Sequence, residues 1–460
     1  FSTFLQTKTK TGCPSIKWLC SDVHSTNWAS AAAGRQEEQN IMSEKRIILP
    51  INLLLLSVCA IFASRKHKKQ IRYVGQKKAF WFIALLSVLV VVPFLGETIF
   101  YFQGEPREAI VALSMLESGN WILPVNYGTD IAYKPPFFYW SIAAVSSLFG
   151  EVTEFSARFP SALAFLAMQL MFFAFVAKRK KRSNGVSGLY SSFVFFEVHR
   201  AAVACRVDMV QVAFIVISLC LLFRWDEKGC RGVPWLAVLL MGCATFDQRA
   251  GRLHIPLRVY RCVSVVARTS FGKAFFSLVG IGLLSFVPYL AWVYVAYRQG
   301  GQPFLDLVLE ENTGRFMGKM SYESHEILYG IFPDFDLGMD SLDVGSGSFL
   351  VWLEVEKHAL PAGRGYPAVA VEEGLGAFRN QSPVQLFTWL VILIIFVFYC
   401  IPKSKRSVYL LPIYPFMAVL IAEYLLALVQ KGARVFRICA IIFASLGLLL
   451  TLVFVVVRLG

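Results

Sequence analysis

Long apolar runs separated by short polar or basic stretches dominate this chain. The runs lie at 47–63, 79–95, 136–149, 159–177, 207–223, 233–244, 274–297, 384–401, 408–429 and 435–457. A helix needs about 20 predominantly apolar residues to cross a bilayer, and shorter runs can span where the bilayer thins around them. The pattern therefore predicts an all-α integral membrane protein with about ten or eleven spans.

The composition agrees with a membrane protein, and it favours neither a nucleic-acid-binding protein nor a metal protein. Of 460 residues, 56% are hydrophobic and 16% are charged, and the formal net charge is +15. The basic residues gather in short runs between apolar segments, such as 65–78 and 178–182, where they set topology and contact lipid headgroups. We therefore expect membrane lipids and no nucleic acid as partners. The ten cysteines form no CxxC pair and the six histidines form no ligand-spaced cluster, so no metal site or cofactor is predicted.

The basic run at 65–78 favours the cytoplasm, which places the loop at 96–135 on the extracytoplasmic side of the next span. The basic cluster at 178–182 also favours the cytoplasm, yet simple alternation puts it outside. Either one short run does not span or the positive-inside rule fails here, and both alternatives stay open. A second polar region, 298–383, is too long for an ordinary connection.

The loop at 96–135 carries the first candidate chemistry. Apolar residues from position 105 to 119 have helical spacing, which predicts a helix lying along the membrane surface. Glu105 at its start, with Arg107 close by, could face the loop interior and take a proton from an attacking hydroxyl or amine. Its alternative role is to complement the helix dipole. Lys134, held by Pro135 and Pro136, suits a phosphate group or simply reaches the interface as a span ends.

Further charges lie at the mouths of later apolar runs. Arg200, Arg206 and Asp208 precede or open the run at 207. Because Arg206 and Asp208 are two residues apart and share no helix face, we expect them to find different partners. Tyr409 can offer a hydroxyl at the interface, and Arg315 lies with His325 in the second polar region. The alternatives are topology signals, an aromatic belt and a solvated loop.

Three stretches taken in order carry a family resemblance: GEPREAIVALSMLESGNW from position 104, KPPFFYW from 134 and ARFPSAL from 157. Looser matches are RVDM, NTGRF, SYESHE and SVYLLPIYPFMAVLIAEY. Together they closely resemble bacterial membrane glycosyltransferases of the GT-C fold, the aminoarabinose-transferase and protein-mannosyltransferase-like enzymes. The resemblance implies a GT-C multi-span bundle in the bacterial inner (plasma) membrane. It also implies transfer of a sugar from an undecaprenyl or other polyprenyl phosphate to lipid A, a protein or a glycan on the extracytoplasmic face.

The same resemblance implies roles for individual residues. Glu105 falls at the position of the expected base or acceptor-orienting acid, and Asp208 is a second candidate carboxylate. The family often has Asp-Glu where this chain has Gly104-Glu105, so which carboxylate acts stays open. The expected donor-phosphate ligands are Lys134, Arg107, Arg158, Arg206 and Tyr409, and the acceptor-side candidates are Arg315 and His325.

We interpret residues 42–460 as one transmembrane glycosyltransferase domain and leave 1–41 unassigned, because Met42 opens a more typical beginning. Segments 247–270 and 327–380 depart from the family pattern, and we hypothesise that both are out-of-frame readings. A transporter or flippase for a lipid or sugar is the rival function, and an inactive relative is a third. A transporter often has repeated halves with broken helices, and the sequence has no such repeat.

Overall fold

The computed structural model describes residues 76–97, 99–100, 104–126, 128, 130–132, 134–179, 196–247, 271–317, 382–400 and 407–430. The predicted spans at 47–63 and 435–457, the segments 1–41 and 327–380, nearly all of 247–270, and His325 lie outside these residues. Within them the elements joined by turns are all helices, apart from one short hairpin. Its strands have two residues each, and β1 (Val125–Asn126) pairs antiparallel with β2 (Asp130–Ile131).

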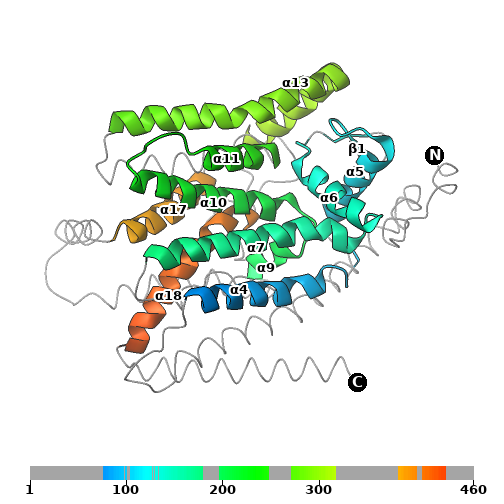
Figure 1. Ribbon diagram of the computed structural model, residues 1–460. Coiled ribbons are helices and arrows are strands. Elements are labelled where there is room, and N and C mark those ends of the chain that lie inside the picture. Colours follow the sequence, from blue (N-terminus) through cyan, green and yellow to red (C-terminus); the bar gives the residue numbers. More distant parts are fainter. Residues whose placement is uncertain are drawn as a thin grey trace, which may run out of the picture.

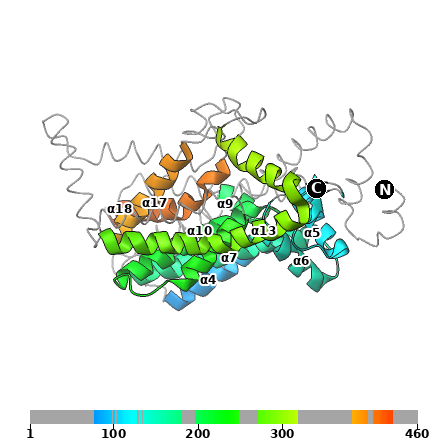
Figure 2. The same ribbon diagram turned by 90° about the horizontal axis from the view of Figure 1, so that it is seen from above.

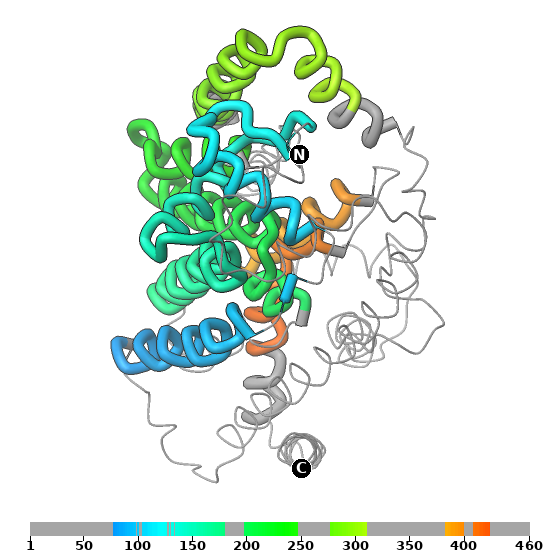
Figure 3. The backbone as a smooth tube through the Cα atoms, turned by 90° about the vertical axis from the view of Figure 1, so that its right-hand side faces the viewer, coloured from blue at the N-terminus to red at the C-terminus, as the bar shows by residue number. Residues whose placement is uncertain are grey.

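The helices form a bundle whose long members run roughly side by side (Figure 1). These are α4 (Gln76–Val91), α7 (Glu154–Arg179), α10 (Val207–Glu227), α11 (Trp235–Asp247) and α13 (Phe271–Met317). Seen end-on, α4 lies at one edge of the bundle and α13 at the opposite edge (Figure 3). Helix α10 packs against both α7 and α11, and α11 packs against α13. The order in space thus largely follows the order in the chain.

The C-terminal described elements complete the bundle on one side, where α17 and α18 flank α10 (Figure 2). They are α17 (Pro383–Cys400), the 3-10 helix η3 (Ser407–Ile413) and α18 (Tyr414–Gln430). The largest core joins them to α7 and α10 through aromatic contacts. The Phe223 and Phe387 ring centroids are 4.7 Å apart, and those of Phe172 and Phe416 are 5.0 Å apart. Residues far apart in the sequence therefore form one apolar interior.

The helices inside the bundle and those at its edges differ in how much of their side chains is exposed. Nearly all of α10 is buried, whereas α4 exposes Trp81, Leu85 and Leu89, and α13 exposes Leu283 and Leu290. Apolar side chains on the outside of a bundle are those that lipid would cover. Four helical segments, 77–94, 154–179, 207–227 and 277–310, are long and apolar enough to cross a membrane, and four shorter apolar helices accompany them. The prediction of an all-α, multi-pass membrane protein is confirmed.

The predicted apolar runs match the described helices closely. A short 3-10 helix, η1 (Val92–Phe94), extends α4, and α13 continues past position 297 to Met317 with a kink at Gly301, whose φ is 63°. Only glycine adopts that conformation readily. The predicted surface helix is present as α5 (Gly104–Ser118). Its placement along a membrane surface stays a prediction.

Helix α5, the hairpin and α6 (Phe137–Phe149) gather at one end of the bundle (Figure 1). Asn120 closes the turn after α5, since its Oδ1 accepts from the backbone N–H of Leu123 at 3.1 Å and its Nδ2 donates to the Leu123 carbonyl at 2.8 Å. The indole of Trp292 on α13 donates to the Ile122 carbonyl at 3.0 Å. Helix α6 begins at Phe137, directly after the two prolines at 135 and 136. These contacts fix the loop that carries the candidate residues.

Candidate active site

A fully buried ion pair joins α5 to α7 at this end of the bundle. The Arg158 Nε and Nη2 atoms donate to the two carboxylate oxygens of Glu105 at 3.0 and 3.1 Å. The same carboxylate accepts from the backbone N–H of Cys205 at 2.7 Å. Arg158 also donates to the carbonyls of Leu95 and Ile99, each at 3.1 Å. Two side chains thus tie together four segments of the chain.

This ion pair bears on the predicted roles of Glu105 as a base and of Arg158 as a phosphate ligand. The Glu105 side chain is 0% exposed and that of Arg158 is 1% exposed, so Glu105 faces the protein interior instead of the loop. Its cationic partner is Arg158, 53 residues away, and not the nearby Arg107. A bidentate guanidinium–carboxylate pair with its remaining donors also used is a structural element. Neither residue is open to a substrate in this arrangement.

A second carboxylate lies one turn further along α5. Glu108 accepts from the Lys134 ammonium and from Nη2 of Arg107 at 3.3 Å, both through Oε1. Its other oxygen, Oε2, is buried and has no hydrogen-bond partner among the described residues. The Glu108 side chain is 4% exposed, whereas Lys134 is 20% and Arg107 is 41% exposed. The anion is therefore enclosed, and its two cations reach toward the outside.

The local charges set the protonation of this group. Burial raises the pKa of Glu108, but Lys134, Arg107 and a hydrogen bond from Tyr139 outweigh it and hold the pKa below its usual value. Burial lowers the pKa of Lys134, partly offset by Glu108 and by the carboxylate of Asp208. Glu108 is thus an anion near neutral pH. Asp208 at the start of α10 is thus close enough to Lys134 for its charge to act on that ammonium.

The expectation that Arg206 and Asp208 find different partners is wrong. Arg206 Nε lies 3.2 Å from Asp208 Oδ2. Arg206 is the N-cap of α10 and is extended, with φ −141° and ψ 142°. The rule about helix faces applies only inside a helix, and the extended Arg206 can fold its side chain back over the first turn.

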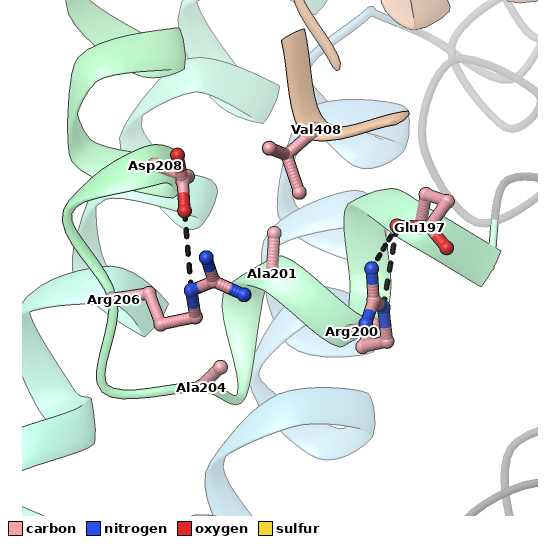
Figure 4. A pocket seen from close by; sticks show the side chains of 7 residues that line it. All are labelled: Glu197, Arg200, Ala201, Ala204, Arg206, Asp208 and Val408. Atoms are coloured by element: carbon pink, nitrogen blue, oxygen red, sulfur yellow. Dashed lines mark hydrogen bonds and ion pairs between the residues drawn. The ribbon is translucent and has the colours of Figure 1, made fainter. Parts of the chain in front are cut away.

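These two residues line one side of a small open pocket (Figure 4), whose cavity volume is about 10 Å³. Glu197 and Arg200, from α9 (Phe196–Ala202), line the other side, and Arg200 Nη2 donates to Glu197 Oε2 at 2.6 Å. The terminal guanidinium nitrogens of Arg206 point into the space between the two ion pairs (Figure 4). The pocket also contacts Val408 of η3, which brings the C-terminal half of the chain to the site.

The sequence-predicted residues therefore divide into groups. Lys134 and Arg107 lie at the Glu108 cluster, and Arg206 with Asp208 lies at the pocket. Tyr409 directly follows the pocket residue Val408, and its ring stacks on Tyr399 at 5.3 Å. Of the two acceptor-side candidates, Arg315 belongs to the helical backbone of α13, and His325 lies outside the described residues. Across the described ranges, no group of three or more His, Cys, Asp or Glu side chains is placed to hold a metal ion.

Two acids of the site, Glu108 and Glu197, are absent from the sequence-based site prediction. Glu108 has a usable signal, because it lies three residues after Glu105 in the same helical motif and therefore on a similar face. Glu197 has a weaker one, as an acid three residues before Arg200 in a short polar stretch. Neither signal identifies the partner, which in the case of Glu108 comes from a different segment.

Comparisons with known proteins find similar sequences and similar folds. Residues 133–292 match the family model described as dolichyl-phosphate-mannose-protein mannosyltransferase. The undecaprenyl phosphate-alpha-4-amino-4-deoxy-L-arabinose arabinosyl transferase of Edwardsiella ictaluri is 26% identical over 383 residues, which are 81% of this chain and 64% of the relative. A second transferase of the same name from Proteus mirabilis is 26% identical over 74% of this chain and 58% of its own length. The chain thus spans less than two thirds of these two relatives.

Solved structures of ArnT from Cupriavidus metallidurans have a similar fold. The structure bound to undecaprenyl phosphate has a TM-score of 0.57 at 19% identity, covering 82% of this chain and 71% of that one. The apo structure has a TM-score of 0.56 at 19% identity, covering 75% and 59%. This chain therefore has the fold of the GT-C membrane glycosyltransferases and resembles their aminoarabinose-transferase and protein-mannosyltransferase-like members, as its motifs predict.

Proposed function

We propose that this chain is a glycosyltransferase that moves a sugar from a polyprenyl-phosphate-linked donor to an acceptor on the extracytoplasmic face of the bacterial inner membrane. The acceptor is lipid A, a protein or a glycan. One observation carries the proposal: two groups of cations and carboxylates lie at one end of a largely apolar bundle, Glu108–Lys134–Arg107 and Arg206–Asp208. Ionisable groups collected at the end of membrane-spanning helices favour a functional site.

The donor phosphate fits the cationic side of this site. When the sugar leaves, negative charge develops on the phosphate oxygens, and fixed cations in a poorly solvated site stabilise that charge. Lys134 is part-exposed, and the terminal guanidinium nitrogens of Arg206 point into the pocket (Figure 4). Arginine and lysine both bind phosphate, arginine through its planar fork of donors. We therefore assign donor-phosphate binding to Lys134 and Arg206, with Arg107 and Arg200 at the margin.

Tyr409 is the proposed further contact to the donor, because η3 brings the neighbouring Val408 to the pocket wall. Asp208 holds Arg206 in place through their ion pair, and its carboxylate partly offsets the lowering of the Lys134 pKa by burial. Glu105 and Arg158 have a structural role, because their buried ion pair joins α5 to α7. Arg315 and His325 stay predictions for the acceptor side.

The test is transfer from a radiolabelled polyprenyl-phosphate sugar in membranes that contain the full chain, compared with Lys134→Met and Arg206→Gln. We expect each variant to lose transfer by roughly 100-fold, the loss typical of one removed electrostatic donor. Glu227→Gln is the matched control. Glu227 pairs with Arg179 at the far end of α10 and its side chain is 44% exposed, so transfer should be unchanged.

An absence of transfer from the folded parent with several donor sugars would refute the enzyme. Movement of labelled undecaprenyl phosphate across proteoliposomes containing the same protein would then favour the transporter, and neither activity would favour the inactive relative.

A further inference from the structure

We propose that Glu108 is the carboxylate that takes the proton from the acceptor during transfer, through Oε2, the oxygen without a hydrogen-bond partner among the described residues. The proposal rests on the function proposed above and names its base. It replaces the sequence-based choice of Glu105.

The contacts of Glu105 leave no room for that role. Both of its oxygens accept from Arg158, and the backbone N–H of Cys205 supplies a third hydrogen bond. Its side chain is 0% exposed. An acceptor would have to break the pair that joins α5 to α7 before it could reach this carboxylate. A base must accept a hydrogen bond from the group that it deprotonates. Both oxygens of Glu105 are already held by Arg158, which makes Glu105 a poorer base than an acid with an unpaired oxygen.

Glu108 is buried too, with its side chain 4% exposed, but its two oxygens are used unequally. Lys134 and Arg107 both bind Oε1, and Oε2 is a buried acceptor with no described donor. Buried polar atoms in native proteins nearly always have a partner, and an unsatisfied one calls for a catalytic role or an absent ligand. A carboxylate oxygen makes this stronger, because an unpaired charged acceptor costs more than a neutral one.

The two cations place this carboxylate close to the proposed donor site. Lys134 and Arg107 are part-exposed, and they are the side of the cluster that a phosphate can reach. Because Lys134 donates to Oε1 of Glu108, a phosphate bound to the exposed side of this ammonium would lie near the same carboxylate. Proximity of this kind is a large part of what an enzyme supplies.

The proposed step is a nucleophilic substitution at the anomeric carbon of the sugar. The acceptor O–H or N–H bond breaks and its proton moves to Oε2 of Glu108. The acceptor atom forms a bond to the anomeric carbon, and the bond from that carbon to the phosphate oxygen breaks. The electron pair of the broken bond leaves with the polyprenyl phosphate, where Lys134 and Arg206 meet the new charge. Glu108 then passes its proton to water.

Donor binding would also adjust the base. In the free protein Lys134 and Arg107 hold the pKa of Glu108 low, which makes it a weak base. A bound phosphate partly neutralises those cations, and the pKa of Glu108 rises. The carboxylate becomes a stronger base only when donor is present, which suits a transferase that must not act on its acceptor alone.

The test compares Glu108→Gln with the parent in two assays, transfer and binding of undecaprenyl phosphate. We expect transfer to fall by about 100-fold or more, within the range of general base catalysis, while binding stays within about twofold. A loss of binding that matches the loss of transfer would mean that Glu108 only positions Lys134, and it would overturn the proposal. So would a Glu108→Gln variant that transfers like the parent.

A second variant decides the matter if Glu108→Gln does not fold. Tyr139→Phe keeps the ring and removes the hydroxyl whose hydrogen bond lowers the pKa of Glu108. The acid limb of the transfer rate against pH should therefore move to higher pH, and an unmoved limb would overturn the proposal. The parent is assayed first: an inactive parent refutes the proposed function together with this inference, whereas an active parent with an active Glu108→Gln variant refutes this inference alone.

Discussion

Replacing Arg158 with methionine should destabilise the protein more than any exposed charge change, because it leaves Glu105 as a buried anion. The substitution removes both hydrogen bonds from Arg158 to that carboxylate, at 3.0 and 3.1 Å. It also removes the donors to the carbonyls of Leu95 and Ile99. Among the described residues, the backbone N–H of Cys205 still donates to Glu105 after this change.

The magnitude follows from the burial of the pair. Removing one partner of a buried ion pair costs about 3–5 kcal/mol, because the other charge is left unpaired. Two lost hydrogen bonds to a charged group, at roughly 1.5–3 kcal/mol each, give a similar sum. At about 2 °C per kcal/mol, the thermal midpoint should fall by roughly 6–10 °C. The Glu105 side chain is 0% exposed, so solvent cannot screen the charge.

The assay is thermal unfolding in detergent, followed by tryptophan fluorescence or by loss of the monodisperse peak on gel filtration. Glu227→Gln again serves as the control, since removing an exposed partner costs about 0–1 kcal/mol. The double variant Glu105→Met with Arg158→Met should be more stable than Arg158→Met alone, because no buried charge remains. An Arg158→Met midpoint equal to that of the control, or a double variant less stable than the single one, would refute the reasoning.

Three further predictions concern other parts of the structure. Burial lowers the pKa of His199 from 6.5 to about 4, so its stabilisation is complete above pH 6.5 and is lost as the pH falls to about 4. That loss is about 3 kcal/mol, and the melting temperature of His199→Gln should vary less over this range. Gly300→Ala should cost about 1–3 kcal/mol of unfolding free energy, because its Cβ would lie 2.9 Å from Phe304 Cβ, which cannot turn away, and 2.6 Å from Leu123 Cδ2. The same change at Gly280, with nothing within 4 Å, should be close to neutral in the same melting assay. Arg200→Gln should weaken undecaprenyl phosphate binding by about tenfold in a titration, since it removes a charged donor from the pocket.

The helices were predictable from the sequence because each one is a local apolar run with local ends. The run predicted to begin at 207 begins there, since Arg206 caps α10 in an extended conformation. The residues that pair were not predictable in the same way. The Glu105–Arg158 bond spans 53 positions and the Glu108–Lys134 bond spans 26. Both depend on how α5 packs, which no local pattern encodes. The Arg206–Asp208 pair also lies beyond the helical spacing rule, because Arg206 precedes the helix and is extended.

The two acids of α5 show where sequence reasoning about function reaches its limit. Glu105 and Glu108 lie one turn apart in one motif, and each has a basic residue close in the sequence. Packing then separates them. Arg158 of α7 binds both oxygens of Glu105, whereas Lys134 and Arg107 both bind Oε1 of Glu108 and leave Oε2 without a partner among the described residues. A carboxylate with all its partners stabilises a fold, and one with a missing partner can accept a proton. Tertiary contacts therefore distinguish the structural acid, Glu105, from the proposed base, Glu108. The two acids should give different phenotypes when they are replaced. Changes at Glu105 should act first on stability, and changes at Glu108 should act first on transfer.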